Sequence, residues 1–141
     1  MVEPPSIRLL TAADLAGRDL TTRAPYAYAA VAEGAFTLVL TAGACPLDAD
    51  GSTVAAGDVA RQAEQVMTNL EQALAGAGSN LTGVVKTTVY VATTSRSDLL
   101  TAWEVVQRRF GAHAPPSTLV GVTVLGYPDQ LVEVEATAVR K

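Results

Sequence analysis

The stretch GAGSNLTGVVKTTVYV, residues 76–91, contains the point at which a helix is predicted to end and a strand to begin. Its glycines are typical of a helix C-terminus, and its Ser-Asn pair favours a turn. The β-branched and aromatic residues that follow favour a strand. Because strand side chains alternate, we expect one apolar face and one mixed face. The apolar face would hold Val85, Val89 and Val91, and the mixed face Lys86, Thr88 and Tyr90.

Two helices are predicted by apolar residues that recur at helical spacing. The first runs from Asp58, which can cap its N-terminus, to about Ala77. Its apolar positions are Val59, Ala63, Val66, Met67, Leu70, Leu74 and Ala77. The second begins near Ser97 and stops at Gly111, after a last turn that contains two arginines.

The remaining periodic segments are predicted strands. They are residues 6–10, 24–32, 36–41, 117–125 and 131–139. The second and third of these are expected to pair as a hairpin, because Glu33-Gly34 between them favours a turn. The whole order predicts an α+β two-layer sandwich, in which a single six-stranded mixed sheet carries both helices on one face.

The other face of this sheet is expected to be covered by self-association. It would display a polar set that alternates with valine, namely Lys86, Thr88, Tyr90, Glu133, Glu135 and Thr137. An open sheet with so many β-branched residues is a poor surface for contact with water. We therefore expect an oligomer.

Composition and charge set bounds on size, partners and location. A chain of 141 residues that is 49% hydrophobic can bury the core of one domain, residues 1–141, of which 1–22 are the least defined. A formal charge of −4 with only 10 Lys and Arg disfavours nucleic acid as a partner. No apolar run reaches the ~18 residues that a membrane span needs. The Met1–Pro5 start lacks the features of a signal peptide, so we expect a cytoplasmic protein.

The sequence contains no pattern typical of a cofactor or metal site. Gly76-Ala77-Gly78 ends a helix, whereas a phosphate-binding loop precedes one. His113 is the only histidine, and we expect it at the surface. Cys45, the only cysteine, cannot form an internal disulfide and is expected to be an inert small side chain. We therefore expect neither a cofactor nor a metal.

From about residue 24 to residue 139, the chain resembles the Rid family, the YjgF-type reactive-intermediate deaminases. The matching pieces are APY (24–26), TAGACPLD (41–48), GS (78–79), VVKTTVYV (84–91), PPST (115–118) and LVEVEA (131–136). The resemblance implies a chorismate-mutase-like fold. It also implies a homotrimer that binds small molecules in pockets between its subunits.

The resemblance also identifies candidate site residues. In deaminating members, an arginine in a Pro-Ala-Arg-Ser/Thr motif pairs with the substrate carboxylate, but Ser117 stands at that position here. The family's Ser-Gly-Gln segment corresponds to Ala42-Gly43-Ala44, and the asparagine of its second helix to Trp103. Glu133 matches the glutamate that positions or activates water, and Tyr26 lies near the pocket. The resemblance thus implies Glu133 and Tyr26 as catalytic residues, and Ser117, Trp103, Ala42 and Leu119 as substrate-binding residues.

The loss of the family arginine changes the expected substrate. A bidentate contact to a carboxylate contributes about 1.5–3 kcal/mol to binding and also orients the substrate. We therefore expect a neutral or apolar ligand instead of a 2-imino acid. Arg23, Arg96 and Arg108 remain candidates for a replacement positive group.

Three functions stay open at this point. The first is hydrolysis of an imine- or enamine-type reactive intermediate, in which Glu133 and Tyr26 would orient the attacking water and relay its proton. The second is a non-catalytic trimer that binds a small ligand or a protein partner. The third is a ribonuclease or translation inhibitor, which the acidic charge disfavours. Glu133 also has a structural interpretation as an interface carboxylate, and Trp103 and Tyr26 have one as packing aromatics.

Overall fold

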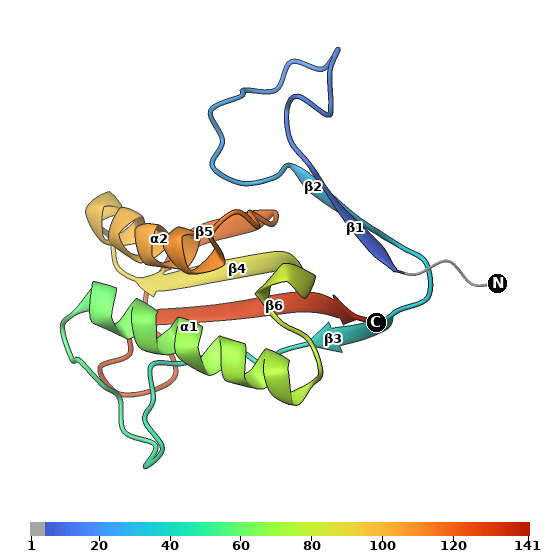
Figure 1. Ribbon diagram of the computed structural model, residues 1–141. Coiled ribbons are helices and arrows are strands. Elements are labelled where there is room, and N and C mark those ends of the chain that lie inside the picture. The colour runs from blue at the N-terminus through green and yellow to red at the C-terminus, as the bar shows by residue number, and fades with distance from the viewer. Residues whose placement is uncertain (1–4) are drawn as a thin grey trace.

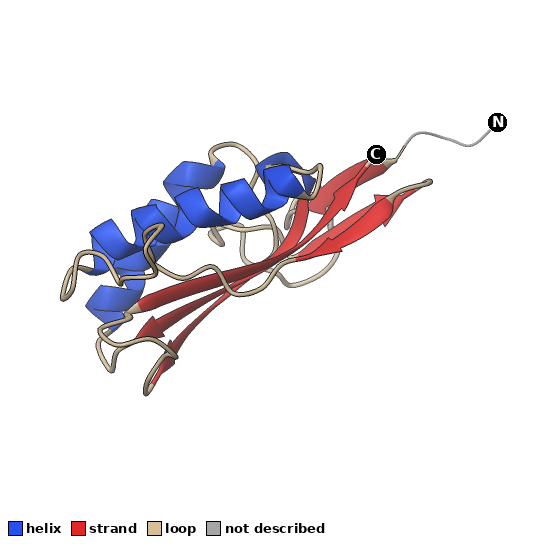
Figure 2. Cartoon of the chain, turned by 90° about the horizontal axis from the view of Figure 1, so that it is seen from below, coloured by secondary structure: helices blue, strands red, loops and turns tan. Residues whose placement is uncertain are grey.

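The computed structural model describes residues 5–141, in which two α-helices and six strands form two layers (Figure 1). In chain order the elements are β1 (Ser6–Leu10), β2 (Ala29–Glu33), β3 (Thr37–Leu40), α1 (Val59–Gly76), the short 3-10 helix η1 (Leu81–Gly83), β4 (Val84–Ala92), α2 (Arg96–Phe110), β5 (Ser117–Val122) and β6 (Val132–Arg140). Figure 2 shows both helices on one side of the strands. The α+β class and the one-sided cover are therefore confirmed. The expectation about the start of the chain falls almost entirely on residues 1–4, outside the described part.

Both helices have the ends that their capping residues predict. The Asp58 carboxylate accepts a hydrogen bond of 3.0 Å from the backbone N–H of Arg61, which starts α1. Gly111 follows α2 with a φ of 66°, a conformation that favours glycine. Within residues 5–141, neither helix combines the length and apolarity that a membrane crossing requires.

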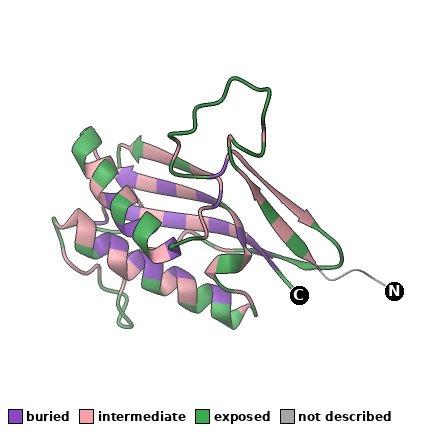
Figure 3. Cartoon of the chain, turned by 45° about the horizontal axis from the view of Figure 1, so that its top comes forward, coloured by how far each residue is buried: buried purple, intermediate pink, exposed green. Residues whose placement is uncertain are grey.

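The core lies between the helices and the sheet. Figure 3 shows buried positions alternating with less buried ones along the two central strands. The fully buried apolar side chains come from α1 and α2 on one side and from β4 and β6 on the other, namely Ala63, Val66, Met67, Leu70, Leu74, Ala102, Val84, Val89, Val91, Val132, Val134 and Ala138. This packing of a helical stripe on alternate strand residues stabilises the two layers.

The strands form two sheets, so the expectation of one six-stranded sheet is wrong. Four strands pair in the order β3-β6-β4-β5, with β4 and β5 parallel and the other pairs antiparallel. β1 and β2 form a separate antiparallel ribbon that extends away from the four strands (Figure 1). The predicted hairpin between β2 and β3 is also wrong, because β2 pairs with β1 while β3 pairs with β6.

The predicted strand at residues 24–32 begins only at Ala29, because its first residues make other contacts. The backbone N–H of Ala27 donates to the carbonyl of Ala114, 3.0 Å away, in the loop before β5. The Tyr28 hydroxyl donates to the carbonyl of Thr21 at 2.9 Å. The first contact holds this segment beside the loop between α2 and β5, and the second joins it to the preceding loop. Tyr26 therefore belongs to a pocket and not to a strand.

β4 contains an irregularity near its start that the sequence pattern did not reveal. Val84 pairs with Ala138 and Lys86 pairs with Thr137, so Val85 is an extra residue in the ladder. As a result Val84 is fully buried and Val85 is not, so the prediction that Val85 lies on the apolar face is wrong. Beyond the bulge the strand alternates as expected.

Candidate functional site

A pocket of about 460 Å³ lies at the β5 edge of the four-stranded sheet, between α2 and residues 25–26. Its lining consists of Pro25, Tyr26, Leu100, Trp103, Ser117, Thr118 and Leu119. The rings of Tyr26 and Trp103 meet edge to face, with centroids 6.2 Å apart and planes at 88°. Four of the six candidate residues therefore come together in this aromatic pocket, and no charged side chain lines it among the described residues.

Ser117 is tied to the core at the position where the resemblance implies an arginine in deaminating relatives. Its Oγ accepts a hydrogen bond of 2.7 Å from the hydroxyl of Thr87, which is buried and lies directly beside it on β4. None of the three candidate replacement arginines lines the aromatic pocket. Arg108, for example, forms an ion pair with Glu64 on α1.

Glu133 lies at a second place, which we call the carboxylate cradle: Gly43, Cys45, Gln130 and Glu133. The Oε1 atom of Glu133 accepts hydrogen bonds of 3.1 Å from the Cys45 thiol and 3.1 Å from the Gln130 amide nitrogen. A Cβ atom at Gly43 would lie only 2.4 Å from Oε2, so this carboxylate position requires a glycine beside it. Two backbone hydrogen bonds between Ala44 and Val134, of 2.7 and 3.1 Å, bring this segment alongside β6.

The thiol in the carboxylate cradle is a hydrogen-bond donor and not a nucleophile. Burial, followed by the hydrogen bond and the negative charge of Glu133, raises the pKa of the Cys45 thiol to about 11. The thiol therefore keeps its proton at neutral pH. On the same sheet face, the Tyr90 hydroxyl donates to Glu135 Oε1 at 2.8 Å, and this hydrogen bond raises the pKa of Tyr90.

The candidate residues fall on opposite sides of the sheet. Ser117 pairs with Thr87, whose side chain faces the helices, whereas Glu133 pairs with Tyr90 on the uncovered face. Two strand spacings separate β5 from β6, which amounts to roughly 10 Å. One small molecule cannot contact both groups within a single chain. Ala42, next to Gly43, lies with Glu133 and away from the aromatic pocket.

Sequence reasoning missed two residues that contact Glu133. Cys45 was expected to be inert, and it does remain protonated, but its contact with the carboxylate was not anticipated. Gln130 attracted no attention because it lies in the turn before β6, yet it is only 4% exposed. The signal available in the sequence was the position of this glutamine, three residues before the candidate carboxylate of Glu133.

No three His, Cys, Asp or Glu side chains gather as metal ligands within residues 5–141. His113, which was expected at the surface, is half-buried, and its Nε2 lies 2.7 Å from the carbonyl oxygen of Val84. Since a carbonyl only accepts, this nitrogen carries the proton. His113 therefore anchors the loop before β5 and does not belong to the site.

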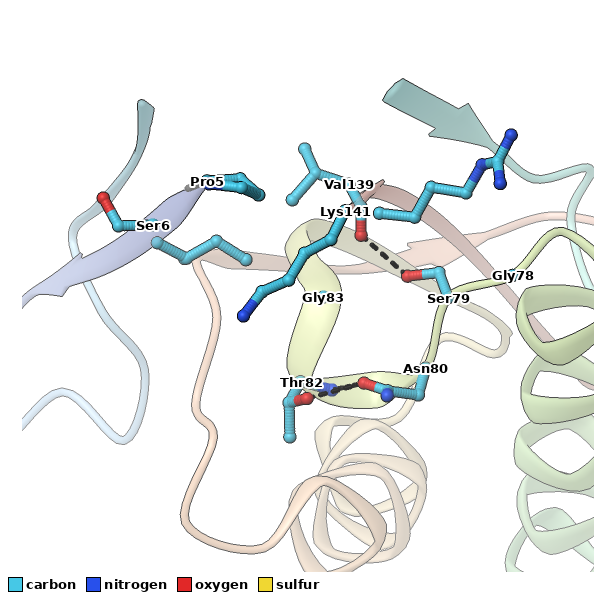
Figure 4. Close-up of a pocket in the computed structure, with 11 residues that line it drawn as sticks. Pro5, Ser6, Gly78, Ser79, Asn80, Thr82, Gly83, Val139 and Lys141 are labelled. Carbon is cyan, nitrogen blue, oxygen red and sulfur yellow. Dashed lines mark hydrogen bonds between the residues drawn. The ribbon is translucent and has the colours of Figure 1, made fainter. Parts of the chain in front are cut away.

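A larger hollow of about 620 Å³ lies between β1, the segment after α1 and the end of β6 (Figure 4). None of the candidate site residues lines it. The Ser79 hydroxyl donates to the carbonyl of Val139 at 2.8 Å, and the Asn80 side chain accepts from the backbone N–H of Thr82 at 2.9 Å. These groups therefore serve the junction between η1 and β6, where Figure 4 shows both hydrogen bonds.

The fold and the aromatic pocket define a class, namely a two-layer α+β protein with a largely apolar pocket at the edge of its sheet. The sequence model of the family described as Endoribonuclease L-PSP matches residues 17–140. The chain therefore belongs to this family, which includes the Rid and YjgF proteins. This match confirms the resemblance to the Rid family.

Three relatives illustrate the match. A RutC family protein of Pyrococcus horikoshii is 34% identical over 83% of this chain and 88% of its own length. The rat 2-iminobutanoate/2-iminopropanoate deaminase is 30% identical over 85% of this chain and 87% of its own. The crystal structure of a Rid family protein of unknown function from Yersinia pestis has a TM-score of 0.80 and 26% identity, and covers 94% of this chain and 97% of that one.

Proposed function

We propose that this protein hydrolyses imine- or enamine-type reactive intermediates that lack a carboxylate, in pockets between the subunits of a homotrimer. The observation that carries the proposal is the aromatic pocket, whose lining contains no charged side chain, together with the hydrogen-bonded carboxylate of Glu133 on the other side of the sheet. The activity in the name of the rat relative supports the reaction class. The uncharged lining of the aromatic pocket argues against a 2-imino acid as substrate.

The separation of the two groups supports assembly from several copies. The uncovered sheet face exposes Leu38 by 55% and Leu40 by 71%. A further hollow of about 220 Å³ on this face is lined in part by Leu40, Lys86 and Glu135. A second copy laid against this face would cover the leucines and bring its own aromatic pocket toward Glu133. The catalytic site is then complete only between two subunits.

The chemistry needs one base and one proton source. The imine nitrogen first takes up a proton from solvent. Oε2 of Glu133 then takes a proton from water, whose oxygen forms a bond to the imine carbon while the C=N π electrons move to nitrogen, which gives a neutral carbinolamine. Glu133 returns its proton to the nitrogen of this carbinolamine. The C–N bond breaks as the carbinolamine hydroxyl releases its proton to solvent, and a carbonyl compound and an amine leave. Tyr26, which lines the aromatic pocket, would hydrogen-bond with the bound substrate.

The test compares two imines and one variant. Native protein is expected to accelerate the hydrolysis of N-benzylidene methylamine, a carboxylate-free aldimine, more than that of freshly generated 2-iminobutanoate. Glu133→Gln is expected to lose on the order of 10²-fold or more in kcat, because it cannot accept the proton. Faster turnover of 2-iminobutanoate would contradict the proposal, since it requires a carboxylate clamp that the aromatic pocket does not contain.

A non-catalytic binding trimer is the second candidate. It is favoured by the two donors on Glu133, because a carboxylate that is already hydrogen-bonded can be purely structural. Binding of the aldimine's stable amine analogue, N-benzyl methylamine, without any turnover of the aldimine would support this function. The ribonuclease hypothesis depends on the family description alone, whereas the aromatic pocket offers no Lys or Arg to a phosphate.

A further inference from the structure

We infer that Gln130 and Cys45 are positioning residues that hold Oε1 of Glu133 and leave Oε2 to the reacting water. The inference rests on the proposed function and adds the residues that orient its base. It requires a rigid donor to Oε1, a second donor to Oε1 that stays protonated, and an Oε2 atom without a donor from the described residues. The structure supplies each of these.

Gln130 is the rigid donor. Its side-chain oxygen accepts from the backbone N–H of Tyr127 at 3.1 Å, so the amide nitrogen must face the other way. That nitrogen donates to Glu133 Oε1 at 3.1 Å and to the carbonyl of Val132 at 3.2 Å. With the side chain buried and its polar atoms all engaged, rotation would break several hydrogen bonds at once.

The turn that carries Gln130 is itself tied to the helix layer. Gln62 on α1 is fully buried, and its oxygen accepts from the backbone N–H of Leu131 at 2.8 Å. Its nitrogen donates to the carbonyl of Asp129 at 2.9 Å. The residues on both sides of Gln130 are thus fixed to the core, which limits movement of the Glu133 carboxylate.

Cys45 is the second donor. Its sulfur lies 3.1 Å from Glu133 Oε1 and 3.4 Å from the carbonyl of Gly43. Both neighbours are acceptors, so the thiol must carry its proton, in agreement with its raised pKa of about 11. Oε1 therefore receives two donors from two different segments of the chain.

Oε2 has no donor among the described residues. Gly43 lies beside it, and any side chain there would occupy its place. Tyr90, directly across on β4, donates its hydroxyl to Glu135 instead. The titratable groups that face Glu133 are thus Cys45, Tyr90 and Glu135. Of these, Cys45 alone donates to its carboxylate.

The kinetic test uses three residues at position 45. Cys45→Ala removes one of the two donors to Oε1, so the carboxylate is held less firmly in the position that the reaction needs. At neutral pH, kcat is expected to fall about 3- to 10-fold with little change in KM. Cys45→Ser keeps a donor and is expected to behave like the native protein. Identical kcat values for all three proteins would overturn the inference.

A second measurement does not depend on turnover. Because Cys45 is the only cysteine, thiolate absorbance reports its titration directly, and Cys45→Ala gives the baseline. Its pKa is expected to fall from about 11 part of the way toward ~8.5 in Glu133→Gln, since burial remains. If the Cys45 pKa falls in Glu133→Gln but the native protein hydrolyses no imine, only the proposed function fails. If the native protein hydrolyses imines but the Cys45 pKa does not change in Glu133→Gln, only the inference fails.

Discussion

The aromatic pocket and the carboxylate cradle differ in how the chain builds them. The pocket brings together α2, β5 and residues 25–26, and its walls are mainly rings and aliphatic side chains. The cradle is polar, and Oε1 of Glu133 is fixed by two donors at 3.1 Å. The pocket can adjust to a ligand by small shifts of side chains, whereas the cradle holds one atom in one place.

Under the proposed function, this difference predicts that the aromatic pocket recognises the substrate and the carboxylate cradle directs proton transfer. Apolar walls recognise a shape and exclude water, but they do not orient a proton transfer. A carboxylate held by hydrogen bonds can orient a proton transfer, and the rate of that transfer depends on its placement within a fraction of an ångström. Substitutions in the aromatic pocket should therefore change KM and substrate choice, whereas substitutions in the carboxylate cradle should change kcat.

The largest expected effect comes from Gly43→Ala. The added Cβ would lie 2.4 Å from Oε2 and 2.8 Å from Cγ, so the Glu133 side chain must move and lose its hydrogen bonds to Cys45 and Gln130. We expect kcat for imine hydrolysis to fall about 10²-fold, because a displacement of about 1 Å can cost that much. The free energy of unfolding should fall by about 1–3 kcal/mol, because the displaced carboxylate leaves the donors of Cys45 and Gln130 without this acceptor. Steady-state kinetics and urea unfolding measure the two quantities.

Gly76→Ala is the matched control for this change. Gly76 ends α1, has open space around the position of a Cβ, and is remote from the carboxylate cradle. It should keep native kcat and gain at most about 1 kcal/mol of stability. If Gly43→Ala kept native kcat as well, the placement of Oε2 would not matter, and the contrast between the two regions would collapse.

The next effect tests whether the two regions meet between subunits. A variant with Tyr26→Ala and Trp103→Ala loses the aromatic pocket, and Glu133→Gln loses the base. Co-expressed in equal amounts, they should recover roughly a quarter of native activity, because each site draws its two halves independently. Activity of the purified mixed assembly is the measurement.

Recovery depends on native halves that come from different chains. When the pocket variant also carries Glu133→Gln, no site in the mixture has both halves, and activity should stay at the background level. A site contained in one chain would give no recovery in either mixture, which would contradict the assembly that we propose.

Ser117→Arg should have a smaller, opposite effect on substrate choice. A guanidinium in the aromatic pocket can pair with a carboxylate, so hydrolysis of 2-iminobutanoate should rise about 10-fold in kcat/KM. The hydroxyl of Thr87 loses its partner, which should cost about 1–3 kcal/mol of stability. Ser117→Ala, the control, should share the stability loss without the gain. A gain in both variants would show that space, and not charge, limits the substrate.

The sequence predicted what depends on local pattern. Helical spacing and caps defined α1 and α2, and the resemblance selected Tyr26, Trp103, Ser117 and Leu119, which do share a pocket. The local sequence pattern could not predict the ribbon of β1 and β2, because strand pairing depends on long-range register. The bulge at Val85 and the contacts of Cys45 and Gln130 also depend on the folded backbone.

The smallest effect concerns the outer surface of the helices, remote from both regions. Glu64 on α1 binds Arg109 at 2.9 Å and also Arg108, and these hydrogen bonds lower the pKa of Glu64. A lowered pKa contributes stability above the unfolded value of ~4.3, which is lost as the pH falls through the folded value. Because the Glu64 side chain is 40% exposed, solvent screening limits the contribution to at most about 1 kcal/mol.

Glu64→Gln should therefore lower the free energy of unfolding at pH 7 by up to about 1 kcal/mol, and the difference from native protein should shrink as the pH falls below the unfolded value of ~4.3 and through the lower folded value. Glu104→Gln, an exposed position on α2 without an ion pair among the described residues, should show no such difference. Both variants should keep native kcat and KM. A change of kcat or KM in Glu64→Gln would mean that a change in helix packing alters the geometry of the site. The roles of the aromatic pocket and the carboxylate cradle could then not be assigned to their own residues alone.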